Sequence, residues 1–313
     1  HFVLANLYVQ TNNTNKAIDE FLKTLEYEDN HEEVFLKLAE LYMKEDMISS
    51  AIDTLERARQ RFDTDTINEN LAQLYLRNNE AQKAKELTKN ELFKAKCMLE
   101  LGEHSEALTI LEKNKQSSAE FYSLMAQYYF VTQDYDKALE NVEEYNKIAP
   151  NTPLVYQMRA LIYENKKDDF NAYLNWGKYN LSRGNKDIAI NEFLNAYQVK
   201  EDNIDLLNTL AILLEETGDK NHSVEFWEKI AQAEPNNKKA LEKLADFRDS
   251  IGDYRAEADY LEKLVEIDKR NAIAIKKLAQ LNEKLKNKDE AIKYYEKYIQ
   301  IAGNANDIEL VRE

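Results

Sequence analysis

The chain is poor in the residues that build disulfides, metal sites and tight turns. Its 313 residues include one Cys, four His, six Gly and three Pro. The single Cys, Cys97, cannot form an internal disulfide, and it shows no zinc-ligand spacing with the scattered His residues. These deficits exclude a disulfide scaffold and a zinc module, and they argue against an all-β fold, which needs many turns.

Positive charge and long hydrophobic runs are also scarce. The chain has 42 Lys and Arg against 58 Asp and Glu, a net charge of −16. This balance argues against a protein that binds nucleic acid by neutralising phosphates. No apolar run approaches the roughly 20 residues that span a bilayer, so we expect no direct membrane insertion in this segment. Since 43% of the residues are hydrophobic, the chain is no disordered tail. Because an all-β fold is also disfavoured, we expect more than 70% helix and no sheet.

Small residues recur in a fixed pattern. Seven segments share a small second residue, a polar turn and, in most cases, another small residue twelve positions after the first: Leu4–Ala17, Leu38–Ala51, Leu71–Ala84, Met125–Ala138, Leu210–Ser223, Leu244–Glu257 and Leu278–Ala291. Apolar residues recur at i, i+3, i+4 and i+7 on both sides of each turn, which predicts a hairpin of two helices. We expect Gly218 and Gly252 to be left-handed C-caps. Ser223 and Glu257 stand where the other hairpins have Ala, and there we expect either slightly splayed hairpins or side chains turned outward.

The spacing of the first small residues is regular except in the centre. Successive intervals are 34, 33, 23, 31, 34, 17, 34, 34 and 34 for Ala5, Ala39, Ala72, Ala95, Ala126, Ala160, Gly177, Ala211, Ala245 and Ala279. One interpretation of the intervals 23 and 17 is a pair of truncated repeats. We prefer another, in which residues 81–101 form one long helix, because they contain no Gly, no Pro and few β-branched residues. Alternation would then run half a repeat out of phase until Asn165–Asp169.

The pattern resembles the tetratricopeptide repeat family, whose repeat carries Leu at position 7, Gly or Ala at 8, Tyr at 11, Ala at 20, an aromatic residue at 24 and Pro at 32. Pro150 and Pro235 are among the matches at position 32. The resemblance covers essentially the whole chain. It implies an all-α fold, a right-handed α-solenoid of about nine stacked helix-turn-helix repeats that is irregular in the centre.

We expect four regions along the chain: N-terminal repeats over 1–80, an irregular, phase-shifted segment over 81–169, C-terminal repeats over 170–303, and the start of a further helix or cap over 304–313. The chain opens at His1 inside a helix, so we expect it to be an excerpt of a longer protein. Stacked repeats are stabilised by apolar burial, and we expect no metal or cofactor.

No catalytic motif is recognisable. The sequence has no Ser-His-Asp arrangement, no Gly-rich phosphate loop, no HExxH and no CxxC. Cys97 lies among apolar residues and is interpreted as a core thiol. We therefore expect no enzymatic activity in this segment.

The resemblance also implies a concave groove, lined by the first helix of each repeat. Carried over position by position, it gives these candidate partner-binding residues: Asn6, Leu36, Glu40, Met43, Gln73, Leu76, Lys178, Leu181, Asn208, Ile212, Lys276 and Gln280. Apolar residues flanked by polar ones favour a protein or peptide segment as the partner. The family's Lys and Asn clamp for a terminal carboxylate is absent. A ladder of Asn at position 6 is absent as well, because Lys37, Asn70, Thr209, Lys243 and Lys277 stand there.

Charge is distributed unevenly. Residues 269–300 carry nine Lys and Arg against four Asp and Glu. This asymmetry favours head-to-tail self-association through the acidic body and the basic C-terminal repeat, or an acidic contact near the C-terminus; a solvated lysine face explains it equally well.

The sequence thus predicts a non-enzymatic interaction scaffold, expected in the cytoplasm. The alternatives are the recruiting region of a larger enzyme, such as a glycosyltransferase, and a peptide-responsive regulator.

Overall fold

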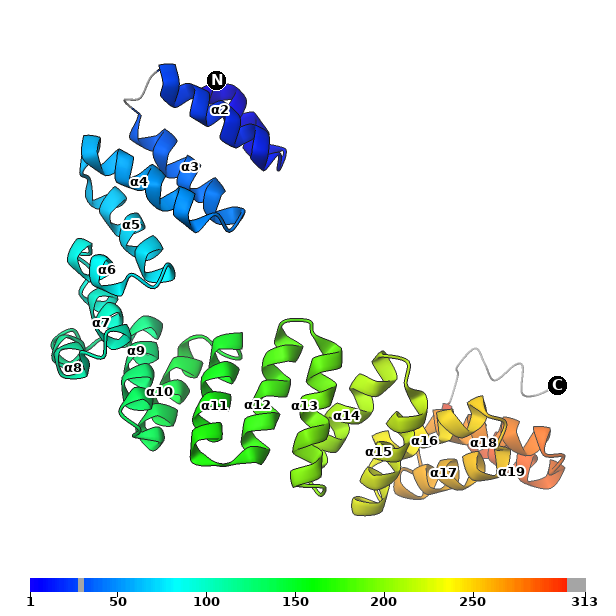
Figure 1. The fold of residues 1–313 in the computed structure, drawn as a ribbon. Coiled ribbons are helices and arrows are strands. Elements are labelled where there is room, and N and C mark those ends of the chain that lie inside the picture. The colour runs from blue at the N-terminus through cyan, green and yellow to red at the C-terminus, as the bar shows by residue number, and fades with distance from the viewer. Residues whose placement is uncertain (28–30, 303–313) are drawn as a thin grey trace. The chain divides into compact units, whose positions relative to one another are not determined.

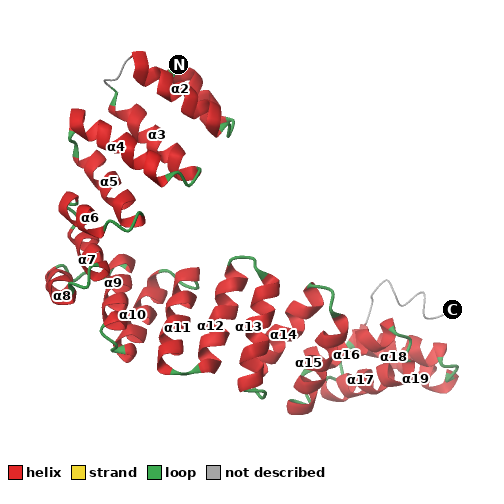
Figure 2. Cartoon of the chain, in the orientation of Figure 1, coloured by secondary structure: helices red, strands yellow, loops and turns green. Residues whose placement is uncertain are grey.

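The computed structural model describes residues 1–27 and 31–302, and every regular element within these ranges is an α-helix (Figures 1 and 2). The expectation of an all-α chain with more than 70% helix is confirmed. Within the same ranges, no helix combines the length and apolar character that crossing a membrane would require. The expected helix start or cap over 304–313 lies outside the described residues. The chain divides into two compact units, His1–Asn151 (unit 1) and Thr152–Glu313 (unit 2).

Unit 1 consists of consecutive helices that pair as antiparallel hairpins, the first helix of each pair packing on the second. Its helices are α1 (Phe2–Gln10), α2 (Thr14–Tyr27), α3 (Glu32–Lys44), α4 (Ile48–Phe62), α5 (Asp65–Arg77), α6 (Ala81–Leu87), α7 (Glu91–Glu100), α8 (His104–Lys113), α9 (Ala119–Val131) and α10 (Tyr135–Ile148).

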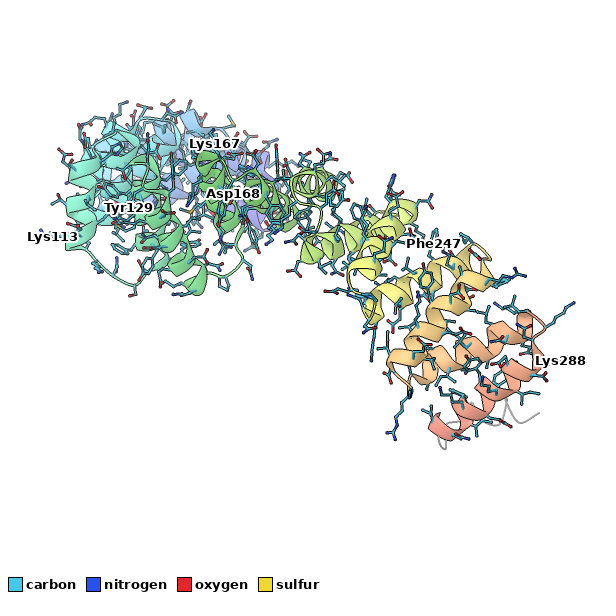
Figure 3. All side chains as sticks on the ribbon, turned by 90° about the horizontal axis from the view of Figure 1, so that it is seen from below. Lys113, Tyr129, Lys167, Asp168, Phe247 and Lys288 are labelled. Atoms are coloured by element: carbon cyan, nitrogen blue, oxygen red, sulfur yellow. The ribbon has the colours of Figure 1, made fainter. Side chains whose placement is uncertain are left out.

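Unit 2 begins with three helices packed in sequence and continues with three hairpins, α14 with α15, α16 with α17, and α18 with α19. Its helices are α11 (Pro153–Lys166), α12 (Asp169–Ser182), α13 (Lys186–Val199), α14 (Ile204–Glu216), α15 (Lys220–Ala233), α16 (Lys238–Ser250), α17 (Tyr254–Ile267), α18 (Ala272–Lys284) and α19 (Lys288–Ala302). Figure 3 labels Lys167 and Asp168 at the turn from α11 to α12.

The paired small residues lie where the two helices of a hairpin cross. Ala5 and Ala17 in the first hairpin are both fully buried. Gly177 in α12 leaves no room for a side chain, because a Cβ there would lie 2.4 Å from the ring of Phe193 in α13. Close crossing therefore requires small residues at these positions, as the spacing predicts.

A left-handed residue makes each sharp hairpin turn. Gly218 has φ 89° and Gly252 has φ 74°, which confirms the predicted C-caps. Elsewhere a residue with a side chain takes the same conformation, as Asn12 does with φ 54° and Lys286 with φ 62°. The turn geometry is thus common to the repeats even where Gly is missing, at some cost in backbone strain.

The expectation of one long helix over 81–101 is wrong. Helix α6 ends at Leu87, and Thr88 has an extended backbone with ψ 139°. The Glu69 carboxylate accepts hydrogen bonds from the Thr88 hydroxyl and the Lys89 backbone N–H, each at 2.7 Å. Asn90 then caps α7 by accepting a hydrogen bond from the Phe93 backbone N–H. Helix propensity alone favours one continuous helix. The helix is broken because Asn90 caps α7 and because the Glu69 carboxylate of α5 accepts the Lys89 backbone N–H.

The interval of 17 residues has a different structure. Ala160 in α11 and Ala172 in α12 are twelve apart and buried, and so are Gly177 in α12 and Ala189 in α13. Helix α12 is therefore the second helix of one hairpin and the first helix of the next. The irregularity expected at Asn165–Asp169 is the turn that leads into this shared helix.

The two departures from Ala are both buried. Ser223 is 2% exposed, and its hydroxyl donates a hydrogen bond to the Ala211 carbonyl oxygen at 2.7 Å. Glu257 is 6% exposed, and its Oε2 atom has no hydrogen-bond partner in the described part of the chain. The alternative that these side chains turn outward is wrong, since each lies within its own helix crossing.

Candidate partner-binding groove

A groove of about 350 Å³ lies between α3 and α5 in unit 1. Its apolar residues come from three helices: Leu36, Ala39, Met43, Leu55 and Leu74. Because α4 contributes Leu55 between the two first helices, the groove is a gap between consecutive hairpins. Four of the predicted partner-binding residues line it together, namely Leu36, Glu40, Met43 and Gln73.

The charges on the rim of this groove are partly compensated. The Lys37 ammonium lies 2.9 Å from a Glu33 carboxylate oxygen and 2.6 Å from the Asn6 side-chain oxygen. Glu40 and Gln73 are exposed and make no side-chain hydrogen bond or ion pair within the described residues. Arg77 also lines the groove, and its Nη2 lies 3.9 Å from an Asp46 carboxylate oxygen. The rim thus offers one free carboxylate and one free amide above an apolar floor.

The two remaining candidates of unit 1 take part in local packing. Asn6 donates a hydrogen bond from Nδ2 to the Phe2 carbonyl oxygen, while its Oδ1 accepts the bond from Lys37. Leu76 is half-buried and packs against the core formed by α3, α4 and α5. Both side chains support the walls of the groove, and neither is among the residues that line it.

The candidates in unit 2 are spread over α12, α14 and α18. Leu181 and Ile212 are half-buried against the unit's core, and Asn208 donates a hydrogen bond to the Ile204 carbonyl oxygen. Desolvation, and secondarily the positive charge of Arg159, lower the pKa of Lys178 below its usual value.

In α18, the Lys276 ammonium lies 5.6 Å from the centre of the Tyr298 ring, and Gln280 is exposed. The structure does not gather these six unit-2 candidates around one groove.

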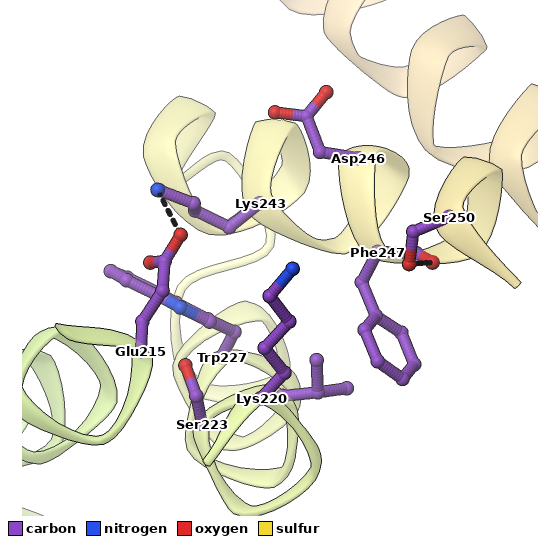
Figure 4. A pocket seen from close by; sticks show the side chains of 9 residues that line it. Glu215, Lys220, Ser223, Trp227, Lys243, Asp246, Phe247 and Ser250 are labelled. Atoms are coloured by element: carbon purple, nitrogen blue, oxygen red, sulfur yellow. Dashed lines mark hydrogen bonds and ion pairs between the residues drawn. The ribbon is translucent and has the colours of Figure 1, made fainter. Parts of the chain in front are cut away.

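Two pockets of unit 2 lie instead on either side of α16. The first, of about 100 Å³, lies between α14, α15 and α16 and is lined in part by Lys220, Trp227 and Phe247 (Figure 4). The second, of about 210 Å³, is lined from α16, α17 and α18, and its side chains include Glu242 and the exposed Ile273. Lys220 and Trp227 are not among the predicted residues, because they come from the second helix of a hairpin and the prediction used first helices only.

Lysines at position 6 connect successive hairpins. Lys243 of α16 forms an ion pair of 2.7 Å with Glu215 of α14. Lys277 of α18 forms one of 2.6 Å with Asp246 of α16. Lys37 of α3 connects to the preceding hairpin by a hydrogen bond that its ammonium donates to the Asn6 side-chain oxygen of α1. A partner that binds in these grooves therefore meets lysines whose charge is already engaged.

Other reactive groups are buried or dispersed. Burial raises the pKa of the Cys97 thiol to about 11, so the thiol stays protonated near neutral pH, in agreement with a core role. Among residues 1–27 and 31–302, no group of three or more His, Cys, Asp and Glu side chains is placed to hold a metal ion.

Two family models match the chain, both described as tetratricopeptide repeat. One matches residues 33–64, which hold α3 and α4, and the other matches residues 277–304 at the C-terminal hairpin. No curated protein sequence matches.

Solved structures also match. The crystal structure of MamA is 18% identical, with 58% of this chain and 90% of that chain covered and a TM-score of 0.36. The C-terminal part of a TPR repeat-containing protein from Cytophaga hutchinsonii is 18% identical, with coverage of 78% and 99% and a TM-score of 0.42. Because similarity at this level is low, the fold assignment stands on the helices themselves and on the two family models.

Proposed function

This chain belongs to the tetratricopeptide repeat proteins, and we propose that it is a non-enzymatic scaffold that binds a segment of a partner protein in the α3–α5 groove. The observation that carries the proposal is the set of four predicted residues around one groove, Leu36, Glu40, Met43 and Gln73. An apolar floor with a polar rim is the usual form of a peptide-binding surface.

The chemistry of the groove selects the segment. An apolar side chain that enters between Leu36, Met43 and Leu55 would lose its hydrated surface, which contributes about 1.5–3 kcal/mol for a fully buried residue. Glu40 is the uncompensated charge on the rim, so it favours a Lys or Arg next to the apolar anchor. Gln73 can donate to and accept from the segment's backbone.

Selection from a library of displayed random 12-residue peptides tests this proposal. We expect the enriched peptides to share an apolar residue within two positions of a Lys or Arg. For one such synthetic peptide, Glu40→Lys should weaken binding about tenfold or more by fluorescence anisotropy, because it replaces an attraction with a repulsion. Raising the salt concentration should weaken binding to the parent protein.

Glu45→Lys is the matched control, since Glu45 is also exposed, lies at the end of the same helix and does not line the groove. It should change the affinity less than twofold. Enrichment of peptides without the apolar–basic pair, or equal affinity for the Glu40→Lys protein, would rule out this groove as the binding site.

A further inference from the structure

The α14–α16 pocket of unit 2 contains an indole N–H without a partner. Trp227 lies one turn after the crossing residue Ser223 in α15 and is 1% exposed. Its Nε1 atom is buried and makes no hydrogen bond to any residue of the ranges 1–27 and 31–302. A buried polar group without a partner is costly, so native proteins seldom keep one. The other tryptophan, Trp176, donates its Nε1–H to Glu164 at 2.7 Å.

The charged side chains of the same pocket leave one positive charge uncompensated. Of the four that line it, Glu215 pairs with Lys243, and Asp246 pairs with Lys277 of α18. The fourth, Lys220, has no hydrogen bond or ion pair from its ammonium group within the described residues. Figure 4 shows Lys220 extending from α15 toward α16, and both Lys220 and Trp227 line this pocket.

The neutral polar groups of the pocket do not supply a free acceptor of comparable strength. The Ser223 hydroxyl donates to the Ala211 carbonyl oxygen, and the Ser250 hydroxyl donates to that of Phe247. The pocket thus has two donors that no other side chain engages within residues 1–27 and 31–302, namely the buried Trp227 indole N–H and the ammonium of the exposed Lys220. An anionic group with two oxygens can accept from both at once.

We propose that this pocket binds the carboxylate of an Asp or Glu side chain on a partner segment, with Lys220 and Trp227 as its donors. The volume of about 100 Å³ is enough for the end of one acidic side chain. The apolar walls from Val224 and Phe247 pack against its methylene groups. This site is independent of the α3–α5 groove, which has a free carboxylate and selects the opposite charge.

Nuclear magnetic resonance of the ¹⁵N-labelled 313-residue chain tests the site directly, because two tryptophans give two indole cross peaks. The spectrum of Trp176→Phe assigns them. The probe is N-acetyl-glutamate methylamide, and its neutral counterpart is N-acetyl-glutamine methylamide. We expect the Trp227 indole proton to shift downfield with saturation in the glutamate derivative, because it gains an acceptor. The Trp176 peak should stay in place.

Lys220→Gln should weaken binding of the glutamate probe about tenfold, since the variant keeps a polar side chain, one bond shorter, but loses the positive charge. Lys229→Gln is the matched control on the same helix, because Lys229 is also exposed and does not line the pocket. A Trp227 peak that no probe moves would show that the pocket holds water only, and that result overturns the proposal. Equal binding of both derivatives, or an unchanged affinity in Lys220→Gln, overturns it as well.

Discussion

The repeat spacing is much shorter than 34 residues at two places, α6 in unit 1 and α12 in unit 2. The helices accommodate the missing residues differently at the two places. At α6 the spacing falls from about 34 to 23 residues, a loss of about three helical turns. The loss is shared by α6, which has 7 residues against 15 in α4, and α7, which has 10 against 13 in α5. At α12 the spacing falls to 17, and one helix serves two hairpins. Loss of whole turns keeps the alternation of helices, whereas loss of a whole helix requires one helix to pack on both sides.

The packing faces of α12 follow from helix geometry. Ala172 and Gly177 are five residues apart, which places them about 140° apart around the helix. Gly177 faces Phe193 of α13, so Ala172 faces a different neighbour. With small residues on two faces, Ala172 and Gly177, α12 can pack closely in two hairpins. Helix α6 belongs to one hairpin, and its small crossing residue is the buried Ala84.

The largest effect is expected at the α12–α13 crossing. Gly177→Ala would place a Cβ within 2.4–2.8 Å of three ring atoms of Phe193, a side chain that is only 1% exposed. We expect a loss of about 3 kcal/mol in the free energy of unfolding, measured by urea titration. The control Gly184→Ala meets no atom within 4 Å and should cost only about 1–2 kcal/mol, from its positive φ of 81°. Equal losses would show that α12 and α13 do not cross at Gly177.

Ala172→Leu and Ala84→Leu compare the second-helix role in the two places. Both residues are buried, so we expect each larger side chain to overpack its crossing and to cost about 1–3 kcal/mol in urea titrations. If Ala172→Leu alone leaves the unfolding midpoint unchanged, α12 does not act as the second helix of α11.

The break between α6 and α7 can be weakened at its cap. Asn90→Ala removes the acceptor of the Phe93 backbone N–H and should lower the free energy of unfolding by about 1 kcal/mol. Asn90→Asp keeps an acceptor and should stay close to the parent. Hydrogen exchange at Phe93 should rise in the Ala variant only; exchange that stays slow would mean that the cap does not hold the break.

A smaller effect, which depends on pH, is expected at Glu257 in unit 2. Burial, with a contribution from the negative charge of Asp249, raises the pKa of Glu257, and Asp246 adds to this while Lys284 and Lys277 oppose it. The folded state thus favours the protonated carboxyl. Its stabilising contribution is complete below the ordinary pKa of about 4.3 and is lost as pH rises through the raised value.

Glu257→Gln stays neutral at every pH, so its stability relative to the parent should increase as pH is raised from about 4 to 7. The effect is limited to about 1.4 kcal/mol for each unit by which the pKa is raised. Urea midpoints of both proteins across this range measure it, and Glu225→Gln, an exposed change, serves as the control. Parallel pH profiles of parent and Glu257→Gln would contradict a raised pKa.

The sequence by itself determined the helical hairpins and their crossings. Pairs of small residues twelve apart, such as Ala5 with Ala17, predicted burial that the structure confirms, because close helix approach tolerates only small side chains at those points. The sequence also predicted that Leu36, Glu40, Met43 and Gln73 line one groove, since the position of a residue in the repeat determines which face of the helix it lies on.

Only the tertiary structure decided the break at Thr88–Asn90, because the Glu69 carboxylate that holds it comes from another helix. It also decided which charges stay uncompensated. Ion pairs between hairpins engage Lys243 and Lys277, whereas Glu40 and Lys220 have no side-chain partner among the residues that the structure describes. Whether side chains of two helices pair depends on the distance between those helices, which the local sequence does not contain. These distances leave a negative charge at the α3–α5 groove and a positive charge at the α14–α16 pocket.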